Sequence, residues 1–325
     1  MDNKFFGRQE YLDILRKRVS GLKLGYRQNI AMVGDELVGK TSLICNFLNN
    51  FYDNEVLIIY LQVRPEAISS FAKRFIGVLF YNFLINSGIP LREDLGFLLA
   101  KSEKYIPKAT LKARMILGLV ETRKKNNIFS ELLSLCEIIK QETGKPSVVI
   151  FDEFHNLESL GVKNLYPEWS KLLMTQKDIM YIIISSLKFK AKTILSKNLS
   201  LLFGNFEVME IEPFDIKTSE EFLKKQAQGF SLDPGLKNFI VHFTGGYPFY
   251  LNLINESLLK TGYSDLGDIL EGLLFESSGI LNQKFSNYIK RFLDSSHSQQ
   301  YLSILYQIAS GHNKIRDIAH LLRLS

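Results

Sequence analysis

The residues best suited to chemistry in this 325-residue chain form a glycine-rich stretch at positions 34–41, Gly-Asp-Glu-Leu-Val-Gly-Lys-Thr. Its spacing fits the pattern G-x-x-x-x-G-K-[ST], in which loop amides surround the phosphates of a nucleotide. Lys40 would reach the β and γ phosphates, and the Thr41 hydroxyl would lie on Mg²⁺. We therefore expect nucleotide contacts from Gly34, Asp35, Glu36, Leu37, Val38, Gly39, Lys40, Thr41 and Ser42.

Two elements must position this loop. Residues 29–33 are an apolar run that suits a buried strand, and residues 41–49 place Leu43, Ile44 and Phe47 at helical spacing. A strand, a glycine-rich loop and a helix N-terminus together form an anion-binding site.

A second motif carries two carboxylates. Residues 148–151, Val-Val-Ile-Phe, run directly into Asp152 and Glu153. Asp152 would hold Mg²⁺ mainly through water, and Glu153 would orient and polarise the attacking water as a general base. The alternative is two surface carboxylates at a strand end. The presence of both motifs in this order favours the catalytic interpretation.

A third element lies at residues 181–184, an apolar run that ends in Ser185 and Ser186. A hydroxyl at this strand end could sense hydrolysis, so we add Ser185 to the catalytic candidates Lys40, Asp152 and Glu153. An ordinary strand cap explains the same two serines.

The strand and helix patterns predict an α/β fold with a parallel five-stranded sheet covered on both faces. The expected strands are residues 30–33, 56–63, 148–151, 180–185 and 206–211. Helical patterns occupy residues 67–86, 111–125 and 127–143 of the α/β part, and residues 218–228, 234–243, 248–260, 266–276, 298–310 and 314–322 after Pro213. Residues 90–107 have no clear pattern. We expect an α/β domain at 1–212, a helical lid at 213–292 and a helical tail at 293–325.

Composition favours a soluble globular protein, since 46% of residues are hydrophobic and 23% are charged. The longest apolar run, residues 75–85, falls short of the roughly 18 to 20 residues needed to span a bilayer. The two cysteines, Cys45 and Cys136, lie in apolar helical patterns, so we expect both to be buried and reduced, as in a cytoplasmic protein. The net charge of +6 permits nucleic-acid contact without showing it.

Four segments in order resemble the AAA+-like P-loop ATPases of the archaeal type and the STAND group, relatives of the origin-recognition ATPases. They are residues 5–10 (Phe-Phe-Gly-Arg-Gln-Glu), residues 34–41, residues 151–153 and residues 245–248 (Gly-Gly-Tyr-Pro). The resemblance covers about residues 4–290. It implies a P-loop NTPase fold, ATP or ADP and Mg²⁺ as cofactors, Gly7 and Arg8 beside adenine and ribose, and Pro248 helping to close the lid.

Simpler structural interpretations of residues 5–10 and 245–248 stay open. Gly7 and Arg8 could form a simple N-terminal turn with an exposed arginine. Gly245 and Gly246 could end one helix and Pro248 could begin the next.

One position departs from the family pattern. Many relatives place an arginine after a Phe-Gly or Tyr-Gly pair before the fifth strand, where it can act in a neighbouring subunit. Here Asn205 follows Phe203-Gly204, so an arginine finger is not evident. An oligomer stays open, and the resemblance fits a STAND-type switch better than a ring motor.

The tail resembles the start of another unit. Residues 315–322 are similar to the second helix of a winged helix-turn-helix, and the sequence ends before a recognition helix. The tail is therefore expected to be a partial winged helix. A plain helical extension is the alternative.

These observations predict a cytoplasmic Mg²⁺- and ATP-dependent ATPase that acts as a conformational switch, with slow hydrolysis stimulated by a DNA or protein partner and no membrane. The alternative is a DNA-binding regulator or mobile-element accessory protein that uses ATP as a conformational ligand. Glu153 argues against a third interpretation, a non-hydrolysing structural module. The preference for ATP over GTP rests on the resemblance.

Overall fold

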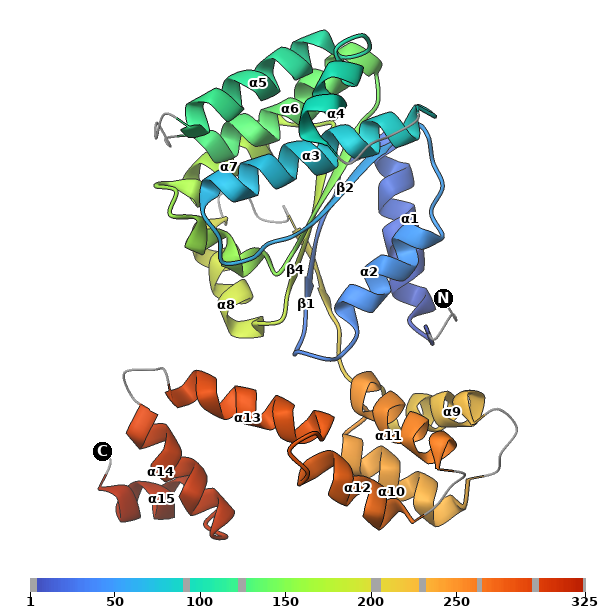
Figure 1. Cartoon of the computed structure of the whole chain (residues 1–325), viewed down its shortest axis with the longest axis vertical. Coiled ribbons are helices and arrows are strands. Elements are labelled where there is room, and N and C mark those ends of the chain that lie inside the picture. Colours follow the sequence, from blue (N-terminus) through green and yellow to red (C-terminus); the bar gives the residue numbers. More distant parts are fainter. Residues whose placement is uncertain are drawn as a thin grey trace. The chain divides into compact units, whose positions relative to one another are not determined.

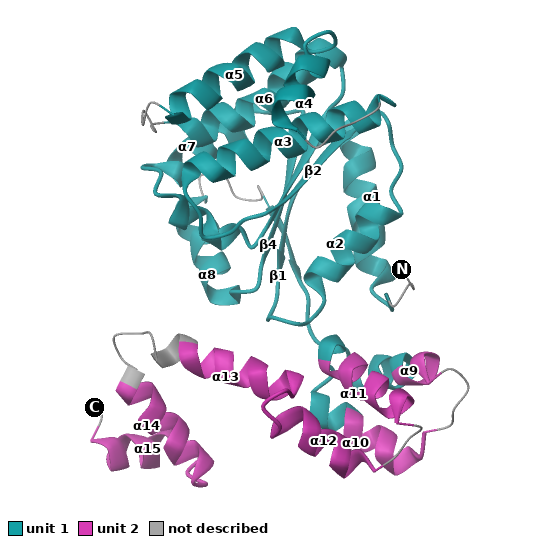
Figure 2. Cartoon of the chain, viewed as in Figure 1, with its two compact units in different colours: residues 1–222, 241–249 teal, residues 223–240, 250–325 magenta. Residues whose placement is uncertain are grey.

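The computed structural model describes residues 5–89, 94–121, 127–199, 206–227, 232–261, 265–293 and 298–323. The chain divides into two compact units, one of residues 1–222 with 241–249 and one of residues 223–240 with 250–325 (Figure 2). Compactness does not test where a domain folds independently, so the boundaries expected after residues 212 and 292 stay predictions.

The first unit contains a five-stranded sheet in the order β2-β3-β4-β1-β5, with all neighbours parallel. This confirms the expected α/β fold. The strands are β1 (Asn29–Val33), β2 (Leu57–Gln62), β3 (Ser147–Asp152), β4 (Ile179–Ser185) and β5 (Phe206–Glu210). Every residue of β1, β3 and β4 is buried, which explains their continuous apolar sequences.

Each face of the sheet is covered by its own set of helices (Figure 1). Successive residues of a strand point to opposite faces, so Ile30 and Met32 pack with α1 (Gln9–Lys23) and α2 (Lys40–Asn49). Ala31 and Val33 belong to the core on the other face. That face is covered by α3 (Ile68–Asn86), α4 (Leu95–Ser102), α5 (Pro107–Glu121), α6 (Ile128–Thr143) and α7 (Leu165–Thr175).

Several helix predictions need correction. The unassigned region 90–107 contains α4, whose N-terminus is capped by Asp94 through the amide of Phe97. Helix α5 begins at Pro107, a residue favoured at the first helical position, and not at residue 111. Residues 122–125 of that prediction lie outside the described residues. Shorter helices η1 (Phe154–Leu160), α8 (Lys188–Thr193) and η2 (Ile194–Asn198) connect the last strands.

Helix α3 corrects the expectation that no apolar segment is long enough to cross a membrane. Among the described residues it alone passes a test of length and hydropathy, with 19 residues and a mean hydropathy of 1.3. Nine of its residues, including Phe71, Phe75 and Leu79, are buried in the core of this unit, whereas Ile85 is exposed. Helix α3 is therefore a core helix of this unit.

The cysteine prediction is half wrong. Cys136 is buried in α6, whereas Cys45 is exposed. Cys45 lies in α2 beside the buried Ile44, and the core-facing positions of that helix are taken by Leu43, Ile44 and Phe47. An apolar pattern locates a helix face only to within a residue or so, which explains the error.

The described residues after β5 are helical, as expected. The helices are α9 (Ile216–Gln226), α10 (Pro234–Thr244), α11 (Pro248–Lys260), α12 (Leu266–Leu274), α13 (Ile280–Leu293), α14 (Ser298–Ala309) and α15 (Ile315–Leu322). Sequence patterns predict all of these except α13. The winged-helix identity of α14 and α15 stays a prediction.

Candidate nucleotide-binding site

The glycine-rich loop joins the end of β1 to the start of α2. Its glycines are needed for steric reasons. A Cβ atom at Gly34 would lie 2.2 Å from the carbonyl oxygen of Ile211. Gly39, which precedes the first residue of α2, has φ +92, a conformation that L side chains rarely adopt. The loop therefore approaches the neighbouring backbone closely and turns sharply into the helix.

Lys40 is almost fully buried, with 5% of its surface exposed. Its Nζ donates hydrogen bonds to the carbonyl oxygens of Gly34 at 3.0 Å and Asp35 at 2.7 Å. Burial lowers the pKa of Lys40, and the nearby carboxylates Glu153 and Asp152 act in the opposite direction. The ammonium group is thus held within the curve of the loop and close to both carboxylates of the second motif.

Asp152 links the two motifs directly. It is fully buried at the end of β3, and its Oδ2 accepts hydrogen bonds from Thr41 Oγ1 and from the Tyr60 hydroxyl, each at 2.9 Å. Burial raises the pKa of Asp152, while these two hydrogen bonds oppose the shift. The hydroxyl predicted for Mg²⁺ therefore contacts the carboxylate predicted for the same ion.

The residues present fit a magnesium ion. Asp152 Oδ1 is buried and has no hydrogen-bond partner among the described residues. A buried carboxylate oxygen beside a hydroxyl oxygen offers the oxygen ligands that Mg²⁺ prefers. Thr41 and Asp152 would hold the ion, directly or through water, and the ion would neutralise charge on bound phosphates.

Glu153 points to a different set of partners. It has φ 54 and ψ 45, a left-handed conformation that turns the chain sharply away from β3. Its Oε2 accepts hydrogen bonds from the backbone amide of Ser186 at 3.0 Å and from Ser186 Oγ at 2.8 Å. His155 Nδ1 lies 3.3 Å from the same oxygen. The adjacent carboxylates therefore belong to separate hydrogen-bond networks.

Ser185 contacts His155 of this network and not Glu153 itself. Its buried Oγ is 2.8 Å from His155 Nδ1 and accepts from the amide of Leu187 at 3.1 Å. Burial lowers the pKa of His155, while Glu153 has the opposite effect. Ser186, rather than Ser185, supplies the hydroxyl that holds Glu153.

Arg8, from the N-terminal segment of the chain, contacts the glycine-rich loop. Its guanidinium donates to the carbonyl of Val38 at 3.4 Å and to that of Glu212, and it lies 4.8 Å from the ring centroid of Phe214. Gly7 precedes it with φ +64. Arg8 is therefore fixed beside the loop and is not a freely exposed arginine of a surface turn.

The segment 245–248 also approaches the loop. Gly246 accepts a hydrogen bond from the Phe214 amide at 2.9 Å, and a Cβ at Gly246 would lie 2.0 Å from the Phe214 carbonyl oxygen. Tyr247 donates its hydroxyl to Asp35 Oδ2 at 3.4 Å. Pro248 is the first residue of α11, so the helix-boundary interpretation of this segment also holds.

The structure thus brings Arg8, Lys40, Thr41 and Asp152 together at one loop, with Glu153 close enough to affect the pKa of Lys40. Gly7 has no contact with the loop among the described residues. Asn205 lies outside the described residues, so the arginine-finger prediction is not addressed. Sequence reasoning missed Tyr60, His155 and Ser186. Tyr60 faces Asp152 because β2 pairs with β3, with Gln62 in register with Asp152. Only Ser186 carried a signal, as the second of two serines at a strand end.

The family model for an ATPase domain found predominantly in Archaea matches residues 5–254. No curated protein matches the chain. Among solved structures, a Walker-type ATPase of Pyrococcus abyssi is 19% identical with a TM-score of 0.61, over 99% of this chain and 85% of that one. At this identity the likeness supports the fold alone.

Two further solved structures have lower TM-scores. A STAND protein of Pyrococcus horikoshii with a tetratricopeptide repeat sensor is 17% identical with a TM-score of 0.44, over 99% of this chain and 37% of that one. The ORC2 protein of Aeropyrum pernix is 13% identical with a TM-score of 0.44, over 78% of this chain and 64% of that one.

Proposed function

Because the chain belongs to the family of ATPase domains found predominantly in Archaea, we propose that it binds ATP with Mg²⁺ and hydrolyses it slowly as a conformational switch. The hydrogen bond from Thr41 Oγ1 to Asp152 Oδ2 carries this proposal. It joins the phosphate-binding motif to the carboxylate motif, as an enzyme of this kind requires.

Each group has a role in the proposed reaction. Loop amides and the Lys40 ammonium bind the phosphates, while Thr41 and Asp152 bind the metal that screens their charge. Glu153 accepts a proton from the attacking water. Its partners Ser186 and His155 orient the carboxylate before the reaction.

The switch would act through the segment 245–248. Tyr247 contacts Asp35 of the loop, and Gly246 is bonded to Phe214. A nucleotide that rearranges the loop would therefore act on the start of α11. A ligand shifts a conformational equilibrium only through its different affinity for the two states, so ATP and ADP should stabilise different arrangements of this segment.

Nucleotide binding is tested with Lys40→Ala. The wild-type protein should bind ATP in the presence of Mg²⁺, measured by calorimetry, and Lys40→Ala should abolish that binding. Lys171→Ala, which changes a lysine with a 67% exposed side chain on α7, is the control and should bind normally. Equal binding by the wild type and Lys40→Ala would refute the assignment.

Partner stimulation needs a separate experiment. ATP turnover should be measured with and without duplex DNA and across protein concentration. A rate that rises with DNA would support a DNA partner, and a rate per molecule that rises with concentration would support an oligomeric enzyme. A low rate under all conditions would favour a protein partner, whereas a fast basal rate would contradict the slow switch.

A further inference from the structure

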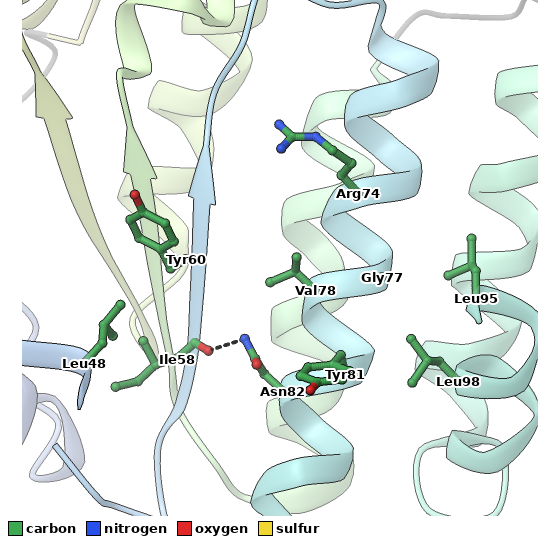
Figure 3. A pocket seen from close by; sticks show the side chains of 10 residues that line it. All are labelled: Leu48, Ile58, Tyr60, Arg74, Gly77, Val78, Tyr81, Asn82, Leu95 and Leu98. Carbon is green, nitrogen blue, oxygen red and sulfur yellow. Dashed lines mark hydrogen bonds between the residues drawn. The ribbon is translucent and has the colours of Figure 1, made fainter. Parts of the chain in front are cut away.

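A cavity of about 680 Å³ lies at the free edge of β2, between β2, α2, α3 and α4 (Figure 3). Its volume is within the range of small-molecule sites, and its lining is mostly apolar. The apolar lining residues are Leu48, Ile58, Val78, Leu95 and Leu98. The cavity lies apart from the glycine-rich loop but shares Tyr60 with the site described above.

Side chains of α3 donate hydrogen bonds to three carbonyls along the outer edge of β2, in part within this cavity. Asn86, Asn82 and Arg74 donate hydrogen bonds to the carbonyl oxygens of Val56, Ile58 and Gln62, respectively. The backbone N–H and C=O groups of alternate residues in an edge strand point away from the sheet. The carbonyl of Tyr60 is therefore the remaining outward carbonyl of this row. The α3 residue placed to bond this carbonyl is Val78, four residues from both Arg74 and Asn82, and its side chain has no hydrogen-bond donor.

One charged side chain, that of Arg74, lines the cavity and is 31% exposed. Arg74 Nε is buried and has no hydrogen-bond partner among the described residues, although its NH2 group is bonded to Glu66 and Gln62. An unmade hydrogen bond on a buried donor costs free energy, so a small shift of the Arg74 side chain that lets a ligand atom accept from Nε would be favoured. The partnered Glu66 already balances the arginine charge, so the ligand needs an acceptor and not a large negative charge.

Gly77 opens the helix wall of the cavity. A Cβ built on Gly77 meets no atom within 4 Å, so the space beside it is open. Gly in a helix interior is destabilising relative to Ala. A helix that keeps a glycine facing an apolar cavity leaves room for a ligand that a side chain would occupy.

We propose that this cavity binds a small amphipathic molecule whose apolar body packs on Leu48, Val78 and Leu98 and whose hydrogen-bond acceptor meets Arg74. Tyr60 connects this ligand to the nucleotide site, because its ring lines the cavity and its hydroxyl bonds to Asp152. The coupling rests on the proposed function, whereas occupancy of the cavity does not.

Occupancy is tested with the fluorescent probe 1-anilinonaphthalene-8-sulfonate, which combines an apolar body with acceptor oxygens. Gly77→Leu should occupy part of the cavity and weaken binding about tenfold, equivalent to about 1.4 kcal/mol. Gly77→Ala, which favours the helix, should weaken it less. Gly118→Leu changes an exposed helical glycine that also has open space beside it, and should bind as the wild type does. Equal affinity of Gly77→Leu and Gly118→Leu, both folded by circular dichroism, would overturn the site.

The acceptor is tested with N-phenyl-1-naphthylamine, which keeps the apolar body but lacks the sulfonate. It should bind several-fold more weakly, and equal affinity would overturn the role of Arg74. Binding of neither probe would overturn the small-molecule assignment in favour of an apolar side chain from a protein partner.

The coupling is tested by repeating the titration with ATP and Mg²⁺. Linkage requires that the nucleotide change the probe affinity by the factor by which the probe changes the nucleotide affinity. We expect a change of at least about threefold in the wild type, which Tyr60→Phe should remove. Nucleotide binding without any such change would overturn the coupling alone. Failure of nucleotide binding would overturn the proposed function and leave the occupancy result intact.

Discussion

Asp152 and Glu153 are neighbours in sequence but lie in contrasting regions of the site. Asp152 is fully buried and bonded to groups from α2 and β2. Glu153 has a side chain that is 24% exposed, and its partners come from the end of β4 and from η1. A buried carboxylate with one bonded and one unbonded oxygen, such as Asp152, is suited to hold a metal. A partly exposed carboxylate, such as Glu153, can exchange its hydrogen-bond partners for water. Under the proposed function, Asp152 would serve metal binding and Glu153 would serve hydrolysis.

The strongest test of this division is Glu153→Gln. Loss of the general base should reduce kcat about 100- to 10,000-fold, while affinity for ATP with Mg²⁺ is retained. Single-turnover hydrolysis and equilibrium binding measure the two effects separately. A parallel loss of binding would show that the two carboxylates act as one unit.

Asp152→Asn should have the opposite profile. Removal of the carboxylate charge should lower the affinity for Mg²⁺ in the nucleotide complex about 10- to 100-fold, as expected for groups that support a metal. Titration of Mg²⁺ at fixed nucleotide concentration measures this effect. An unchanged Mg²⁺ midpoint would remove Asp152 from the metal site.

Ser186→Ala and Ser185→Ala compare two adjacent hydroxyls. Ser186→Ala removes one hydrogen bond to the Glu153 carboxylate and should lower kcat about tenfold, since hydrogen bonds to charged groups contribute about 1.5–3 kcal/mol. Ser185→Ala should have the smaller effect, because its Oγ contacts His155. A larger loss for Ser185→Ala in steady-state assays would favour the hydrolysis-sensing role predicted from sequence.

Tyr60→Phe should have the smallest effect on the rate, about threefold, comparable with the loss of one weak hydrogen bond. Its clearer signature is the pH profile. The Tyr60 hydroxyl lowers the pKa of Asp152 against the larger effect of burial, so its removal should raise that pKa further. Mg²⁺-dependent nucleotide binding is lost as Asp152 becomes protonated, so its acid limb should move to higher pH in Tyr60→Phe. An unchanged acid limb would mean that another group titrates.

The surroundings of Asp152 could be predicted from the sequence more completely than those of Glu153, for a physical reason. The loop and the end of β3 are continuous segments whose composition reflects their own local geometry. The partners of Glu153 depend on which strand ends lie together. Tyr60 could not be assigned either, because its contact requires the pairing of β2 with β3.

The fold shows the same division between local and long-range information. Apolar runs located all five strands, and glycine and proline located the boundaries of α6 and α11. The order of the strands and the position of α3 on the edge of β2 arise from packing between distant segments. Helix α13 was missed although Ser278 and Gly279, residue types favoured before a helix, precede it and its apolar residues recur at helical spacing.

The partly covered edge of β2 has a consequence for the behaviour of the protein in concentrated solution. An outer strand with free amides and carbonyls recruits strands of other chains and so begins aggregation. In this protein Arg74, Asn82 and Asn86 occupy three of those carbonyls with side-chain donors. Helix α3 therefore covers part of this edge of the sheet, and we expect partial unfolding of α3 to expose these carbonyls to strands of other chains.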